Sequence, residues 1–117
     1  QLGDEGVAAL VDALLRARGE PALSELYLRN CGLVRLPAAV GALPHLQRLD
    51  LDGNTQLGDE GVAALVDALL RARGEPALSE LYLRNCGLVR LPAAVGALPH
   101  LQRLDLDGNT QLGDEGV

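Results

Sequence analysis

The segment LSELYLRNCGL, residues 23–33, decides the fold. Its apolar positions are Leu23, Leu26, Leu28, Cys31 and Leu33, separated by mostly polar residues. Between residues 25 and 28, leucine alternates with polar side chains at the two-residue period of a half-buried strand. The segment therefore predicts a short β-strand with one face turned to the core.

The same spacing occurs at three further places, residues 46–57, 78–88 and 101–112. In the first and third of these, asparagine replaces the cysteine, and one extra residue precedes the last leucine. Residues 1–55 recur without a substitution as residues 56–110, and residues 111–117 begin a third copy. We expect a single repeat domain over residues 1–117, made of two identical units and a partial third.

These four segments match the pattern L-x-x-L-x-L-x-x-N/C-x-L, so the chain resembles the leucine-rich-repeat family over essentially its whole length. The resemblance implies an α/β solenoid, a horseshoe segment with a parallel sheet on its concave side. The openings of successive repeats are alternately 23 and 32 residues apart. The short repeat resembles the plant and bacterial type, and the long repeat the ribonuclease-inhibitor and NOD-like-receptor type. The 32-residue spacing exceeds the usual 20–29 residues.

Four parallel strands are predicted, over residues 25–28, 48–51, 80–83 and 103–106. Helices are predicted from Asp4 to Arg18 and from Asp59 to Arg73, on the convex side. Their apolar residues, at i, i+3, i+4 and i+7, form one stripe that faces the sheet; in the first helix these are Val7, Leu10, Val11 and Leu14.

The ends of the helices carry their own signals. Asp4 is the predicted N-cap, Arg16 and Arg18 suit the negative end of the helix dipole, and Gly19 can close the helix. In the short repeat, Pro37 and Pro44 predict an extended segment with at most one helical turn over residues 38–42. Helices and extended segments should therefore alternate on the convex side.

The composition excludes several classes of partner. The net charge is −6 and the isoelectric point is near 4.7, so the positive field that gathers nucleic acids or anionic membranes is missing. No apolar run approaches the roughly 20 residues that span a bilayer. We expect a soluble protein in an unknown compartment, cytoplasmic if produced recombinantly.

Cys31 and Cys86 occupy the N/C position of the repeat pattern, whose side chain, by the family resemblance, points inward and bonds the adjacent turn. We expect both to be buried and unpaired. Two strand spacings separate them, about 9–10 Å, which exceeds the ~7 Å between Cα atoms that a disulfide tolerates. Without clustered histidines they also give no zinc-site spacing.

Residues 50–54, DLDGN, place oxygen ligands at positions one, three and five of a calcium loop. The similarity ends there, because position six is Thr55 and position twelve is Gly61, where an EF-hand needs glycine and glutamate. His45 and His100 follow prolines in predicted surface turns. No triad or phosphate-binding loop can be assembled, so we expect no catalytic, metal or cofactor site and no enzymatic activity.

The outward strand positions are the candidate contact surface for a protein partner, because the family commonly uses its concave face in this way. In a parallel, in-register stack they form three lateral rows. Two rows alternate in charge sign, so the surface neutralises itself and its exposed pairs mainly favour one register. The rows are Glu25, Arg48, Glu80 and Arg103; Tyr27, Asp50, Tyr82 and Asp105; and Arg29, Asp52, Arg84 and Asp107.

Natural tandem repeats diverge at surface positions, so identity over 55 residues indicates a designed or consensus scaffold without a native ligand, with a very recent natural duplication as the other origin. The alternative is a fragment of a natural receptor-like protein that binds a protein partner on the concave face. Uncapped ends predict end-to-end association of copies. Because residues 111–117 repeat residues 1–7, we expect one of these heptapeptides to be displaced at such a junction.

Overall fold

The fold comes from a computed structural model that describes residues 3–16, 24–36, 40, 43, 45–71, 76–110 and 112. The expected displacement of a terminal heptapeptide concerns residues 1–7 or 111–117. Of these, residues 1, 2, 111 and 113–117 lie outside the described residues. No described helix is long and apolar enough to cross a membrane.

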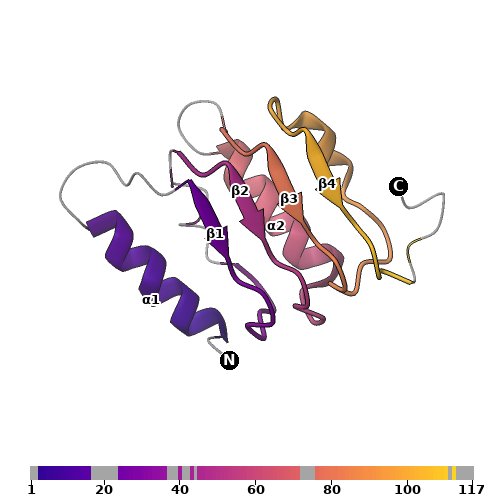
Figure 1. Cartoon of the computed structure of the whole chain (residues 1–117), viewed down its shortest axis with the longest axis horizontal. Coiled ribbons are helices and arrows are strands. Elements are labelled where there is room, and N and C mark those ends of the chain that lie inside the picture. The colour runs from indigo at the N-terminus through magenta and orange to yellow at the C-terminus, as the bar shows by residue number, and fades with distance from the viewer. Residues whose placement is uncertain are drawn as a thin grey trace.

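Four short parallel strands form one sheet in sequence order (Figure 1). The aligned leucines are Leu26, Leu49, Leu81 and Leu104. Each strand ends one residue earlier than predicted, yet the pairing continues, since the Leu28 amide donates to the Asp50 carbonyl at 2.8 Å. The strands are β1 (Glu25–Tyr27), β2 (Arg48–Asp50), β3 (Glu80–Tyr82) and β4 (Arg103–Asp105).

Two 14-residue helices, α1 (Gly3–Arg16) and α2 (Gly58–Arg71), accompany the sheet. Both begin one residue before and end two residues before the predicted bounds. Figure 1 shows α2 behind the middle of the sheet and α1 beside β1. The predicted stripe is confirmed in α2, where its four members are all buried: Val62, Leu65, Val66 and Leu69.

Asp59 of the second helix is the equivalent of Asp4, the N-cap predicted for the first helix. Asp59 lies inside the first turn of α2, and its carboxylate accepts hydrogen bonds from the Val89 and Arg90 amides at 2.9 and 3.1 Å. The reason is that the next repeat brings its own free amides to this point. Asp59 therefore joins two repeats; the side chain of Asp4, its equivalent, lies outside the described residues.

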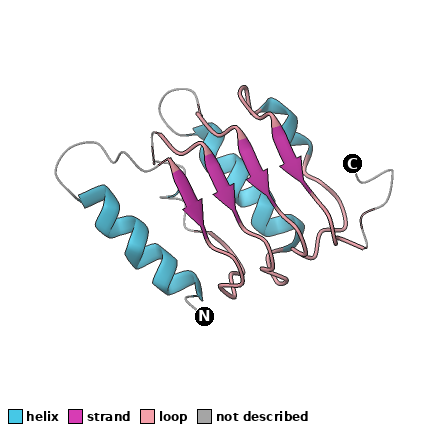
Figure 2. Ribbon diagram, in the orientation of Figure 1, coloured by secondary structure: helices cyan, strands magenta, loops and turns pink. Residues whose placement is uncertain are grey.

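The short repeat carries a 3₁₀ helix, η2 (Ala93–Ala97), on the side of the sheet that α2 covers (Figure 2). Its amide-to-carbonyl bonds run from Val95 to Pro92 and from Leu98 to Val95, both at 3.2 Å. Its bounds are those of the predicted turn, residues 38–42, moved by one 55-residue unit. Five residues with i→i+3 bonds make somewhat more than one 3₁₀ turn between the flanking prolines. Most of residues 37–44, the equivalent in the first unit, lie outside the described residues.

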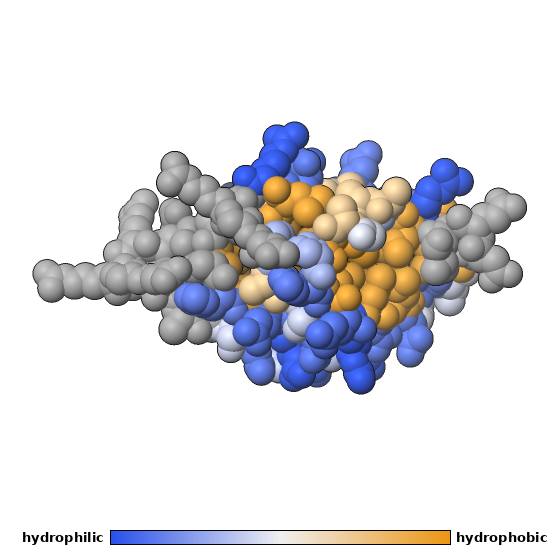
Figure 3. Space-filling model, turned by 90° about the horizontal axis from the view of Figure 1, so that it is seen from above, coloured by the Kyte–Doolittle hydropathy of each residue, from blue (hydrophilic) through white to orange (hydrophobic). Residues whose placement is uncertain are grey.

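The core is a leucine and valine layer shared by all four strands and both kinds of convex segment. Seen from above, Figure 3 shows this hydrophobic layer with hydrophilic residues along both of its borders. Burial is most complete in the middle of the stack: Leu49 and Leu81 are 0% exposed, whereas Leu104 in β4 is only half-buried.

Candidate functional site

We call the outward-facing residues of β1–β4, together with the residue two positions after the end of each strand, the strand face. The register confirms the first two predicted rows, since Glu25 lies beside Arg48 and Tyr27 beside Asp50, and the pattern repeats through β4. The horseshoe curvature, and hence the concavity of this face, stays a prediction.

One ion pair in the first row joins β2 to β3. Arg48 Nε lies 2.8 Å from Glu80 Oε1, and its terminal nitrogen donates to Oε2 at 3.0 Å, which makes the pair bidentate. Arg48 and then the Tyr82 hydroxyl, which also donates to this carboxylate, lower the pKa of Glu80. The bond to Glu80 in turn raises the pKa of Tyr82.

The arginines of the third row do not pair along that row alone. Arg29 Nε contacts Asp50 at 2.6 Å, in place of Asp52. Arg84 Nε bridges Asp52 at 3.3 Å and Asp105 at 3.0 Å. Asp52 turns toward the following strand because its Oδ1 accepts the Arg84 amide at 2.8 Å. The pairs therefore cross between rows and connect neighbouring strands diagonally.

Asp50 is a correction to the predicted contact surface. Its side chain is only 2% exposed, because Arg29 covers one oxygen while the Asp52 amide donates to the other at 3.1 Å. A partner on this face would meet Arg29 before it met Asp50. Asp105, the equivalent in β4, is 23% exposed.

Two tyrosine–arginine pairs stack on the strand face; Tyr27, Arg29 and Arg84 are exposed, whereas Tyr82 is half-buried. The Arg29 guanidinium lies 5.9 Å from the Tyr27 ring centroid, and Arg84 lies 5.9 Å from that of Tyr82. Tyr27 is 49% exposed. Its hydroxyl donates to Glu25 at 2.8 Å and accepts from Arg48 at 3.3 Å, so its polar atom is already hydrogen-bonded.

Asparagine at the N/C position of the long repeat points inward and bonds the adjacent turn, as the family resemblance implies for this position. Asn54 is 0% exposed. Its Oδ1 accepts the Cys31 and Leu33 amides at 3.1 Å, and its Nδ2 donates to the Leu28 and Leu51 carbonyls at 2.9 and 2.7 Å. Asn109 makes the equivalent four bonds in the second unit. The recurring N in the repeat pattern was the available signal.

The two cysteines are both free, but they differ. Cys86 is 0% exposed, its thiol donates to the Leu51 carbonyl at 3.1 Å, and burial raises its pKa to about 11. Cys31 is only half-buried, which corrects the expectation that both are buried. Its thiol donates to the Arg29 carbonyl at 3.4 Å, within its own turn.

The calcium-like segment is committed to other contacts. The carboxylate oxygens of Asp50 accept hydrogen bonds from Arg29 and from a backbone amide. The side-chain amide of Asn54 donates its hydrogen bonds to backbone carbonyls of two neighbouring turns. Across the described residues, no group of three or more metal-ligating side chains comes together. His45 and His100 are exposed in turns, as predicted.

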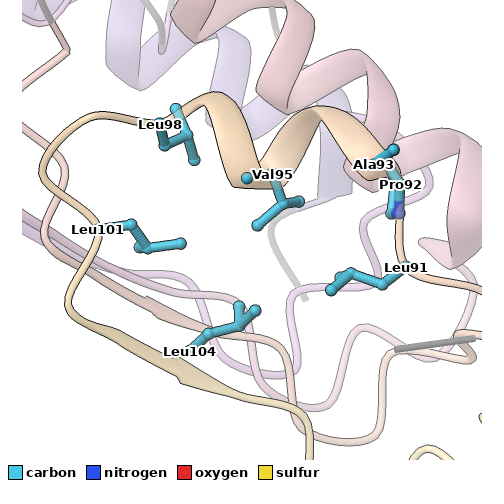
Figure 4. Close-up of a pocket in the computed structure, with 8 residues that line it drawn as sticks. Leu91, Pro92, Ala93, Val95, Leu98, Leu101 and Leu104 are labelled. Atoms are coloured by element: carbon cyan, nitrogen blue, oxygen red, sulfur yellow. The ribbon is translucent and has the colours of Figure 1, made fainter. Parts of the chain in front are cut away.

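An apolar hollow of about 420 Å³ lies at the β4 end of the stack. Figure 4 shows its lining side chains, from the η2 segment on one side and from the β4 segment on the other. The lining residues include Leu91, Val95, Leu98, Leu101 and Leu104. No polar side chain is among the lining residues, so the hollow suits an apolar segment better than a polar small molecule.

Comparison with known proteins bears on these repeats. A family model described as "Leucine Rich repeat" matches residues 42–66 and 97–117. Each match begins at the same position of the 55-residue unit and covers a strand of the long repeat and residues that follow it. The search of curated proteins gives no match. With the four-stranded parallel sheet and its repeating leucines, these matches support the assignment of the repeats to the leucine-rich-repeat family.

Proposed function

We propose that the chain is a structural repeat scaffold of designed or consensus origin, without catalytic activity of its own, which associates end to end with further copies. Leucine-rich repeats serve as scaffolds or as protein-interaction modules, and the choice between these roles depends on the strand face. The observation that carries the scaffold role is that charged side chains of this face pair with one another between strands.

Arg29, Arg48 and Arg84 each contact a carboxylate of a neighbouring strand, at 2.6 to 3.0 Å for the closest atoms. A ligand that used these arginines would first have to break contacts that hold adjacent repeats together. Identity over 55 positions supports the designed or consensus origin, because surface positions of natural repeats drift.

End-to-end association is supported by the different burial of identical residues. Leu10 in α1 is 40% exposed, whereas Leu65, its equivalent in α2, is 2% exposed. The exposed Leu10 at one end and an apolar hollow at the other favour contact between the two ends.

Sedimentation equilibrium of the full chain between about 1 and 200 μM tests the association. The apparent mass should rise with concentration above the 12.3 kDa monomer, and a constant monomer mass would overturn the end-to-end contact. Insertion of one further identical unit tests the scaffold role. It should add a nearly constant increment to the free energy of unfolding, and an unchanged value would contradict a nearest-neighbour stack.

The second candidate is a natural receptor-like fragment that binds a protein on the strand face. The Tyr27–Arg29 stack, which is exposed, and the Tyr82–Arg84 stack, whose tyrosine is half-buried, favour it, because tyrosine and arginine dominate the energetically important positions of interfaces. The flanks of the encoding gene distinguish the origins. Further identical units favour the scaffold, and divergent repeats or a fused effector domain favour the receptor.

A further inference from the structure

The register of the end-to-end contact can be deduced from the chain itself. Residues 1–55 and 56–110 are identical, so a difference in burial between equivalent residues measures what the neighbouring unit covers. Two sets of residues are more exposed to solvent than their equivalents in the other unit. Leu10 belongs to the first set, at the α1 end, and Leu104 to the second, at the β4 end.

Inside the chain, both sets have a covered equivalent. Leu46 and Leu49, which correspond to Leu101 and Leu104, are 2% and 0% exposed. β3 pairs with β2 on the side of Leu49 that corresponds to the open side of Leu104. The start of α2 also packs closely on the first repeat, since a Cβ added at Gly61 would lie 3.0 Å from the Val34 carbonyl oxygen.

We infer that the β4 end binds the α1 end of a second copy, in the register in which residues 31–57 contact residues 58–88 inside the chain. The inference rests on the proposed end-to-end association and adds its geometry. β1 of the second copy pairs with β4, with Leu26 beside Leu104. α1 of the second copy enters the hollow between η2 and β4, whose lining Figure 4 shows. Leu10 becomes buried there, as its equivalent Leu65 of α2 is buried inside the chain.

Charge complementarity supports this register. The internal contact holds two ion pairs between its two sides, Arg48 with Glu80 and Asp52 with Arg84. Their equivalents across the junction are Arg103 with Glu25 and Asp107 with Arg29 of the second copy. All four of these residues are exposed in the single chain, so both pairs can form without breaking the register of the sheet.

Cys31 provides a reporter at the junction. Its equivalent, Cys86, is buried and donates to the Leu51 carbonyl of the preceding turn. Leu106 is the equivalent of Leu51, so Cys31 of the second copy is placed to donate to the Leu106 carbonyl. Cys31 should therefore change from half-buried to buried when the copies join, while Cys86 is buried throughout.

The test is maleimide labelling of the full chain at about 1 μM and about 200 μM, with each cysteine quantified by peptide mass spectrometry. We expect labelling of Cys31 to slow at least tenfold at the higher concentration, with the maleimide-to-protein ratio kept constant and rates corrected for reagent concentration. Cys86 should be slow at both. Association without protection of Cys31 overturns the register but leaves end-to-end association standing; a monomer at all concentrations overturns both.

Two variants test the direction of the contact. Leu10→Glu blocks the α1 end and Leu101→Glu blocks the β4 end, so each alone should associate at least about tenfold more weakly, because each loses a leucine that the contact buries. Mixed together, they should form a dimer that does not grow, since one open α1 end meets one open β4 end. Leu70→Glu is the matched control: Leu70 is 38% exposed on α2, close to the 40% of Leu10, yet lies away from both ends.

Each variant is first checked for the circular dichroism and unfolding transition of the parent chain. Should Leu101→Glu fail to fold, Asp107→Arg replaces it, because Asp107 is exposed and its reversal opposes Arg29 of the second copy. A mixture that stays monomeric, or a Leu70→Glu variant that weakens association as much as Leu10→Glu, would overturn the proposed register.

Discussion

The thiol of Cys86 donates to the carbonyl of Leu51, 35 residues earlier in the chain, at 3.1 Å. The identical residue Cys31 is half-buried and bonds only the Arg29 carbonyl of its own turn, a bond that Cys86 also makes, to Arg84 at 3.5 Å. Two residues with the same sequence neighbours thus differ because only one has a preceding repeat among the described residues to contact.

Thiol labelling of the dilute chain should separate the two cysteines. With its pKa raised to about 11 by burial, Cys86 holds roughly a hundredfold less thiolate at neutral pH than an ordinary cysteine. We expect Cys31 to react at least about a hundredfold faster at pH 8, and labelling of Cys86 to increase as the pH approaches 11. In 8 M urea the two rates should converge, and equal rates in the folded chain would contradict the assignment.

Asn54→Ala should destabilise the fold by about 2–4 kcal/mol, because the amides of Cys31 and Leu33 and two carbonyls lose a buried partner together. Asn109→Ala should cost less, since Asn109 is 8% exposed and water can replace part of its bonding. Urea unfolding of both variants measures the difference. An Asn109→Ala cost equal to or above that of Asn54→Ala would show that depth in the stack does not set the penalty.

Reversal of Arg48 should reduce stability more than reversal of Arg103. Arg48→Glu places a negative charge against Glu80 and removes a bidentate pair, whereas Arg103 lies exposed in β4. The double variant makes the whole first row acidic. Thermal unfolding at low salt and in 1 M NaCl checks this: the loss should shrink in salt, which screens exposed charges. Unchanged stability at low salt would count against a stabilising ladder.

The pH dependence of stability should contain a contribution from Glu80. Its pKa is lowered from 4.5, first by Arg48 and then by Tyr82, so the folded chain binds fewer protons at this site than the unfolded chain. Such a group adds stability above its ordinary pKa, and the gain is lost as the pH falls through the folded pKa. Between about pH 5 and pH 3, the parent chain should lose more stability than Glu80→Gln; parallel losses would contradict the shift.

The sheet, its order and its register followed from the leucine spacing, because a two-residue period fixes which side of each strand is buried. The site was harder to predict. The three rows did not predict the direction in which each side chain points. Asp52 points toward Arg84, so Arg29 pairs with Asp50. Identical letters also hid the difference between Cys31 and Cys86, since burial depends on the neighbouring repeat and not on the local sequence.

Gly53→Ala should be among the more damaging small substitutions in the chain. Gly53 has a φ of +80°, and a Cβ there would lie 1.9 Å from Oδ1 of Asn30 on the neighbouring repeat. An alanine must therefore both adopt a left-handed backbone and displace an asparagine side chain, which together should cost about 1–3 kcal/mol.

Gly96→Ala is the matched control, because Gly96 lies in η2 with nothing within 4 Å of an added Cβ and is not among the glycines with positive φ. This substitution should be neutral or slightly stabilising. Combining Gly53→Ala with Asn30→Gly removes the collision but not the backbone strain, so it should recover part of the loss. Equal free energies of unfolding for Gly53→Ala and Gly96→Ala in urea would show that the two repeats do not approach this closely at Gly53.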